Sequence, residues 1–149
     1  MRLLLLLATC LCLLPIEHVH AEQSADRDTA ATITVRITGI TQPGQLVVLL
    51  YDRNGWLHPE AALQQLRIPI HTATPMRCQL YASYPQHYAI EAFLDLNGNG
   101  KLDMHWFPIP GPDEPVGFSN HYRPFAKPAF DKASFALQSP TAEITIHLH

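Results

Sequence analysis

Short runs of alternating apolar and polar residues, separated by prolines, limit this chain to a β-rich fold. Ile33, Val35 and Ile37 alternate with polar neighbours, which is the period of a strand with one buried face and one solvent-exposed face. The chain has 13 prolines, and proline cannot donate a hydrogen bond to the interior of a sheet. A turn is predicted at residues 41–44, where Pro43 and Gly44 suit a chain reversal, and we expect it to join the first two strands in a hairpin.

The same periodicity continues along the chain. Further strands are predicted at residues 46–51, 67–72, 76–82, 87–94, 133–137 and 144–148, and a short helix at residues 59–66. About seven short strands at this spacing predict an all-β fold, a single antiparallel β-sandwich. Residues 104–132 form one long proline- and aromatic-rich loop, and loops of that length usually serve a site or carry a small core of their own.

The first residues predict export. Met1 and Arg2 precede an apolar run that ends near Leu14, as in a secretory signal. The run is shorter than the roughly 20 residues of a membrane span. We predict a signal peptide at residues 1–21 that is cleaved after Ala21, a flexible leader at 22–31 and one folded domain at 32–149, which is periplasmic or secreted and has no membrane span after cleavage. An uncleaved anchor is the alternative.

Composition and motifs narrow the function classes. The net charge of −3 argues against nucleic acid as a partner. Ser83, Ser119 and Ser134 lack the context of a nucleophile elbow, and no glycine-rich phosphate loop precedes a helix. Glu91 and Asp95 would lie some 13 Å apart on a strand, too far for the carboxylate pair of a retaining glycosidase. We therefore expect a non-enzymatic protein.

Residues 95–103, called the acidic loop below, carry the strongest functional signal. Their sequence fits the first nine positions of a D-x-[DN]-x-[DN]-G calcium loop. The predicted Ca²⁺ ligands are the side chains of Asp95, Asn97, Asn99 and Asp103 and the backbone carbonyl of Lys101. Gly100 would allow the sharp turn, and Leu102 would anchor the loop inward.

The acidic loop departs from a helical calcium hand. Trp106 stands at the twelfth position, where such a hand places a bidentate Glu, and the preceding residues have the period of a strand. The final carboxylate must come from elsewhere, and Asp113 and Glu114 are the nearest candidates. The alternative is a glycine-rich loop in which the Asp and Asn side chains hydrogen-bond their own backbone without a metal.

These features predict an exported binding or structural module. A structural Ca²⁺ would order residues 104–132 as a recognition surface, with Trp106, Phe118, Tyr122 and Phe125 as contacts to a glycan or another envelope component. Alternatively, these aromatic residues cap one end of the fold. The rival function is a metal-assisted hydrolase of the envelope that uses a metal-bound water near Asp95 and Asp103. A purely structural subunit is a third possibility.

Several segments in a fixed order resemble DUF2141, a bacterial family of unknown function. They are Tyr88-Ala89-Ile90 leading into the acidic loop, then Pro110, Gly117-Phe118-Ser119-Asn120 and Pro128-Ala129-Phe130. The resemblance covers nearly all of the chain after residue 21 and implies an exported small β-domain with no assigned activity. Members often carry His where this chain has Leu94, and a Gly-Ile-Pro step where it has Phe107-Pro108-Ile109-Pro110. No role for that histidine can therefore transfer.

Overall fold

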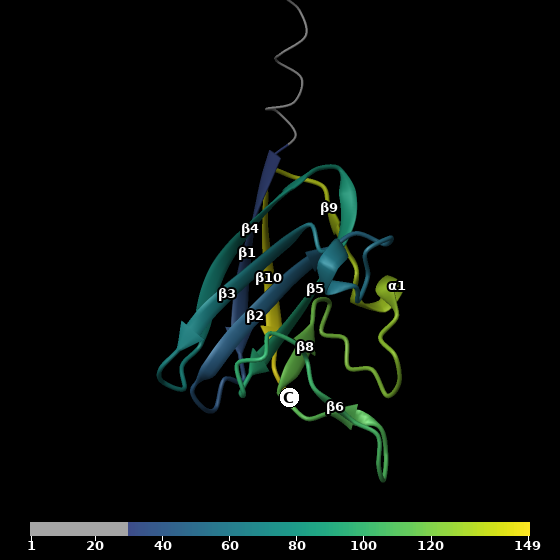
Figure 1. Ribbon diagram of the computed structural model, residues 1–149. Coiled ribbons are helices and arrows are strands. Elements are labelled where there is room, and N and C mark those ends of the chain that lie inside the picture. The colour runs from purple at the N-terminus through teal and green to yellow at the C-terminus, as the bar shows by residue number, and fades with distance from the viewer. Residues whose placement is uncertain (1–29) are drawn as a thin grey trace, which may run out of the picture.

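The computed structural model describes residues 30–149, which form an all-β fold, as predicted. The strands are β1 (Ala30–Thr38), β2 (Gly44–Tyr51), β3 (Gln64–Ile70), β4 (Met76–Ser83), β5 (Gln86–Asp95), β6 (Met104–His105), β7 (Gly111–Pro112), β8 (Val116–Phe118), β9 (Phe135–Leu137) and β10 (Thr141–His147) (Figure 1). A single helical turn, α1 (Phe130–Ala133), precedes β9. The predicted signal peptide and residues 22–29 of the predicted leader lie outside the described residues, and β1 begins two residues before the predicted domain start.

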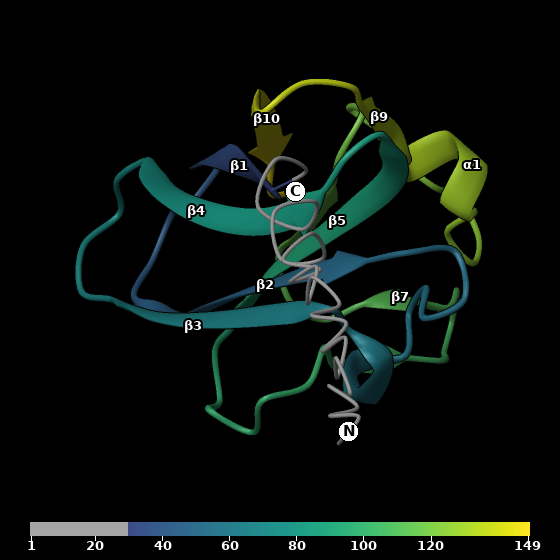
Figure 2. The same cartoon turned by 90° about the horizontal axis from the view of Figure 1, so that it is seen from above.

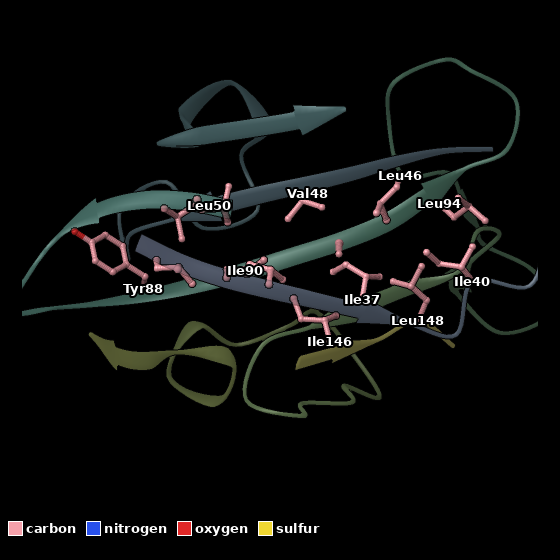
Figure 3. Close-up of a cluster of buried hydrophobic side chains, with 14 of the residues drawn as sticks. Ile37, Ile40, Leu46, Val48, Leu50, Tyr88, Ile90, Leu94, Ile146 and Leu148 are labelled. Carbon is pink, nitrogen blue, oxygen red and sulfur yellow. The ribbon is translucent and has the colours of Figure 1, made fainter. Parts of the chain in front are cut away.

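The strands form two main sheets that share one core. The smaller sheet has the order β10-β1-β4, and the larger has the order β3-β2-β5-β8, with β9 also paired to β5. Figure 2 shows β1 and β4 on one side of the molecule and β2 and β3 on the other. Between them lies a cluster that includes Ile37, Val48, Ile90 and Ile146, which come from both sheets (Figure 3). The predicted period of two in β1 is confirmed, because Ile33, Val35 and Ile37 are all fully buried.

Two predictions about strand pairing are wrong. β1 and β2 do not form a hairpin, because β1 pairs with β4 and β10 while β2 pairs with β3 and β5. The turn near Pro43 therefore carries the chain from one sheet to the other. The fold is also not wholly antiparallel, since β1 and β10 run parallel. A turn sequence specifies a reversal, but it does not specify which partner a strand finds.

The predicted helix at residues 59–66 is also wrong. Only a 3₁₀ turn forms at Pro59–Ala61, and β3 already begins at Gln64. In β3, Leu66 and Ile68 pair with Val48 and Leu46 of β2 and pack against the shared core. Burial of these alternate side chains against a neighbouring strand outweighs the weak helical preference of a short segment.

The outer face of the larger sheet is covered by its own apolar layer. β5 is buried on both faces from Tyr88 to Asp95. On the outer side, Phe93 and Tyr51 pack with Trp56, and a neighbouring cluster contains Phe118 and Phe130. Residues 104–132 are therefore less irregular than predicted: they contribute β6, β7, β8 and part of α1, and some of their aromatic side chains close this layer.

Candidate metal centre

The acidic loop leaves the end of β5, where Asp95 is the last strand residue. The Asp95 side chain is only 1% exposed. One of its carboxylate oxygens accepts a hydrogen bond of 2.7 Å from the backbone N–H of Gly98, and the other accepts one of 2.7 Å from Gly100. Gly98 and Gly100 both have a φ of +76°, a backbone conformation that L side chains rarely adopt. The two glycines thus let the loop curl around a buried carboxylate.

Asn97, Asn99 and Asp103 face one another across the loop. The Asn97 amide nitrogen donates to Asp103 Oδ2 at 2.6 Å, and the Asn99 amide nitrogen donates to both Asp103 oxygens at 2.9 and 3.0 Å. The amide oxygens point the other way and accept from backbone N–H groups, Asn97 from Asn99 at 3.0 Å and Asn99 from Lys101 at 2.8 Å. Two amide groups therefore occupy the space in front of the Asp103 carboxylate.

A third carboxylate reaches the loop from outside it. Glu114 is 5% exposed and accepts hydrogen bonds from the backbone N–H groups of Leu96 at 2.8 Å and Asp103 at 3.2 Å. Asp113, the other candidate, turns away, and its Oδ1 lies 2.7 Å from His105 Nδ1. Of the two carboxylates that the sequence offered, only Glu114 therefore borders the acidic loop.

The inner wall of the loop is apolar. Leu102 is partly buried and packs against the cluster of Val47, Leu49 and Phe93 on the outer face of the larger sheet. The predicted inward anchor is thus confirmed. Arg67 of β3 lies on the outside and donates to the carbonyl oxygen of Gly100 at 3.4 Å. The loop is held to the sheet at both of these points.

The oxygen atoms of this site suit Ca²⁺, but hydrogen bonds within the loop already engage them. Carboxylate, amide and carbonyl oxygens are the ligands that Ca²⁺ prefers. Within residues 30–149, Asp95, Asp103 and Glu114 form no ion pair with a basic side chain. In the same range, however, no three His, Cys, Asp or Glu side chains are placed to hold a metal as they stand. Ligation would require the Asn97 and Asn99 amides to turn their oxygens toward Asp103.

The four aromatic residues of the predicted recognition surface do not share one environment. Phe118 is 5% exposed, and its ring lies 5.9 Å from that of Trp56 and 6.3 Å from that of Tyr122. Trp106 and Phe125, in contrast, are 78% and 109% exposed. Phe118 and Tyr122 therefore belong to the outer apolar layer, while Trp106 and Phe125 are open to solvent.

Sequence reasoning missed a buried ionisable pair in the outer layer. Glu91 of β5 is buried, and the Tyr51 hydroxyl donates to its Oε2 at 3.3 Å. Burial raises the pKa of Glu91 to about 7, and the hydrogen bond from Tyr51 lowers it in part. Burial and the nearby Glu91 also raise the pKa of Tyr51. A glutamate within the apolar run 88–94 was the signal that could have revealed this pair.

Two cavities lie away from the acidic loop. The larger, of about 500 Å³, is lined by Phe130 and by polar residues around Arg53 and Asp131, which form an exposed ion pair. The smaller, of about 220 Å³, has His121, His147 and His149 in its wall, and the rings of His147 and His149 lie 4.5 Å apart. Neither cavity is lined by a residue of the predicted metal site.

The fold and the loop define a class of protein: a small all-β domain with an oxygen-rich loop at the end of a central strand. Residues 35–145 match the family described as uncharacterised proteins conserved in bacteria, DUF2141. The chain belongs to this family, so the resemblance found in the sequence is confirmed. No curated protein and no solved structure matches the chain. In the described part of the chain, no helix is long and apolar enough to span a membrane.

Proposed function

We propose that this protein is an exported, non-enzymatic β-domain whose acidic loop binds a structural Ca²⁺ ion. The observation that carries the proposal is that Asp95, Asp103 and Glu114 each hydrogen-bond groups of the acidic loop and that none of the three has a basic partner in residues 30–149. Two of them, Asp95 and Glu114, are buried. Asp95 and Glu114 each accept two backbone hydrogen bonds, which offset part of the cost of burying their negative charge, and a bound cation would offset the remainder. Export is supported by the signal-like pattern of residues 1–21.

Binding would exchange one set of interactions for another. The Asn97 and Asn99 amide nitrogens hydrogen-bond the Asp103 carboxylate and so occupy the position that a bound cation would take. Turning the two amides brings their oxygens to that position, but it breaks their hydrogen bonds with the N–H groups of Asn99 and Lys101. Because these lost bonds oppose ligation, we expect a dissociation constant of about 10⁻⁴–10⁻³ M, the range of extracellular calcium modules.

An ion at this site would fix the base of the following hairpin. Asp103 immediately precedes β6, and Glu114 follows β7 by two residues. The two carboxylates therefore border both ends of the segment between them. A cation shared by Asp103 and Glu114 would hold these ends together and order the hairpin as a recognition element, with an envelope component or a glycan as its partner.

The hydrolase alternative gains no support from the geometry. A metal-bound water must be open to a substrate, but Asp95 is 1% exposed and Glu114 is 5% exposed. Asp103 lies on the more exposed side of the loop, but the Asn97 and Asn99 amide groups hydrogen-bond its carboxylate. A structural role for the ion accounts for this burial, because a structural site is enclosed by its protein ligands.

Isothermal titration of the purified protein with Ca²⁺ tests the proposal. With a dissociation constant of 10⁻⁴–10⁻³ M, about 10 mM Ca²⁺ should stabilise the fold by roughly 1.4–2.7 kcal/mol and raise the Tm by several degrees. Asp103→Asn should abolish the heat of binding. Asp131→Asn, which alters an exposed carboxylate paired with Arg53, should leave it unchanged. No heat at millimolar Ca²⁺ together with an unchanged Tm would show that the loop is closed by its own hydrogen bonds alone.

A further inference from the structure

The hairpin of β6 and β7, residues 104–112, exposes a group of large apolar side chains. Met104 pairs with Pro112 and His105 with Gly111, and the chain reverses between them. Trp106, Phe107 and Ile109 are 78%, 87% and 75% exposed, and Met104 is 46% exposed. Figure 1 shows this hairpin projecting from the two sheets, at the end of the molecule opposite the start of β1. We call it the apolar hairpin.

Its sequence differs from that of an ordinary exposed turn. No Asp, Glu, Lys or Arg occurs from residue 104 to residue 112. Surface loops are normally polar, and clustered exposed apolar side chains mark sites that bind a partner or a membrane. Other exposed large apolar residues lie elsewhere, such as Leu63 just before β3 and Tyr81 on β4. By contrast, Trp106, Phe107 and Ile109 are exposed together on one projecting turn. This clustering indicates that the turn binds a partner.

We propose that the apolar hairpin inserts into the surface of a lipid bilayer. The proposal rests on the proposed function only for export to a compartment that contains a membrane, and it does not depend on Ca²⁺. A bilayer closes around a projecting turn of any shape, whereas a protein partner must offer a matching groove. The interfacial zone of a bilayer also favours tryptophan and other aromatic rings, such as those of Trp106 and Phe107.

The size of the apolar surface favours a bilayer over a second copy of the chain. Large apolar side chains bury roughly 150–250 Å² each, so the three residues exposed on the turn, Trp106, Phe107 and Ile109, offer roughly 500 Å² in total. A stable protein interface takes about 800 Å² from each partner. The hairpin alone is too small for a stable dimer, but insertion of two or three large side chains suffices for reversible membrane binding.

The backbone of the hairpin is also suited to an environment with little water. Unpaired N–H groups are costly in lipid, because nothing there accepts their hydrogen bonds. Pro108, Pro110 and Pro112 have no N–H group to satisfy. The pairing of β6 with β7 engages further backbone groups at the base. The turn therefore presents few free donors along the part that would enter the membrane.

Polar groups mark where insertion would stop. His105 Nδ1 lies 2.7 Å from Asp113 Oδ1, and their side chains are 41% and 52% exposed at the base of the hairpin. Asp103 and Glu114 lie just beyond this pair along the chain. The inserted part is thus limited to the turn, and the acidic loop would remain at the level of the lipid headgroups or above it.

Co-sedimentation with vesicles tests the proposal directly. The full exported protein is mixed with vesicles of phosphatidylcholine containing phosphatidylglycerol, in Ca²⁺ and separately in EDTA. The wild-type protein should sediment with the vesicles, and Trp106→Ser and Phe107→Ser should each weaken partitioning by about tenfold or more. Tyr81→Ser is the matched control, because Tyr81 is a 56% exposed aromatic residue paired with Thr32 near the start of β1. It should bind as the wild type does.

Fluorescence adds a readout from the hairpin itself. The chain has two tryptophans, and Trp56 is packed in the outer layer. Vesicles should shift the emission of the wild-type protein to the blue, and brominated lipids should quench it. Trp106→Phe keeps an apolar side chain, so it should still sediment with the vesicles but lose the shift and the quenching.

The outcomes separate this proposal from the calcium proposal. Vesicle binding in EDTA by a protein that shows no calorimetric Ca²⁺ signal supports the hairpin and refutes the calcium loop. A calorimetric Ca²⁺ signal without vesicle binding does the reverse. If the serine variants bind vesicles as the wild type does, the hairpin is not the inserted element. If gel filtration instead shows a dimer that Trp106→Ser dissociates, the hairpin contacts a second copy and the bilayer proposal is overturned.

Discussion

Replacing Glu91 with Gln should remove a large part of the pH dependence of stability between pH 4.5 and 7. Glu91 is buried beneath the outer apolar layer, and burial raises its pKa from 4.5 to about 7. The folded protein therefore holds a proton that the unfolded chain releases. This contribution is complete below pH 4.5 and is lost as the pH rises through about 7.

The shift in pKa sets the size of the effect. A rise of roughly 2.5 units, at about 1.36 kcal/mol each, corresponds to about 3 kcal/mol. This is a substantial fraction of the 5–15 kcal/mol that stabilises a typical domain. Gln resembles the protonated carboxyl in shape and stays neutral, so the variant should keep the stability that the wild-type protein loses. Tyr51→Phe removes the hydrogen bond that lowers the Glu91 pKa, and should move the loss to higher pH.

Urea unfolding at about pH 4 and about pH 8 measures the effect. The informative quantity is the difference between wild type and Glu91→Gln at the two pH values, because every other ionisable group is present in both proteins and its contribution cancels. Glu143→Gln is the control, since the Glu143 side chain is 62% exposed on β10. It should retain the wild-type pH profile. An identical loss of stability in wild type and Glu91→Gln would refute the argument from burial.

Further expected outcomes concern the acidic loop and the outer layer. Gly98→Ala and Gly100→Ala both place a side chain at a φ of +76°, at a cost of about 1–2 kcal/mol each, but only Gly100→Ala must also displace Arg67. Thermal unfolding should therefore show the larger loss for Gly100→Ala, and equal losses would mean that Arg67 yields freely. Ser119→Ala should cost about 1–3 kcal/mol in urea unfolding, because the buried Ser119 hydroxyl joins the N–H of Ile90 and the carbonyl of Ala133. A smaller loss would show that these two backbone groups find other partners.

The strands could be predicted from local pattern, but their partners could not. Ile33, Val35 and Ile37 show the period of two, and their burial follows from it. The pairing of β1 with β10 depends on residues far apart in sequence, and nothing in either strand identifies the other. The helix predicted at residues 59–66 is wrong for the same reason. The strand form of β3 depends on β2 beside it, which a local helical preference cannot reflect.

The candidate site divides in a similar way. The spacing within residues 95–103 placed Asp95, Asn97, Asn99 and Asp103 in one loop, because residues of a short turn are necessarily close. Asp113 and Glu114 were both candidates for the final carboxylate of the site. The structure selects Glu114 as the neighbour of the loop because the hairpin returns it to the backbone of Leu96. The direction of a side chain after an intervening hairpin depends on register, which the sequence pattern did not determine.

β1 is the central strand of its sheet, and it needs the end of the chain to complete it. The Thr38 hydroxyl and the His147 ring are hydrogen-bonded, although the two residues are 109 positions apart in the sequence. Ile146 of β10 is fully buried in the shared core. Until β10 arrives, one edge of β1 presents unpaired N–H and C=O groups that could recruit a strand from another molecule. Such distant pairings also form slowly. A chain synthesised only as far as β9 therefore cannot complete this sheet, and the shared core can close only after β10 has emerged.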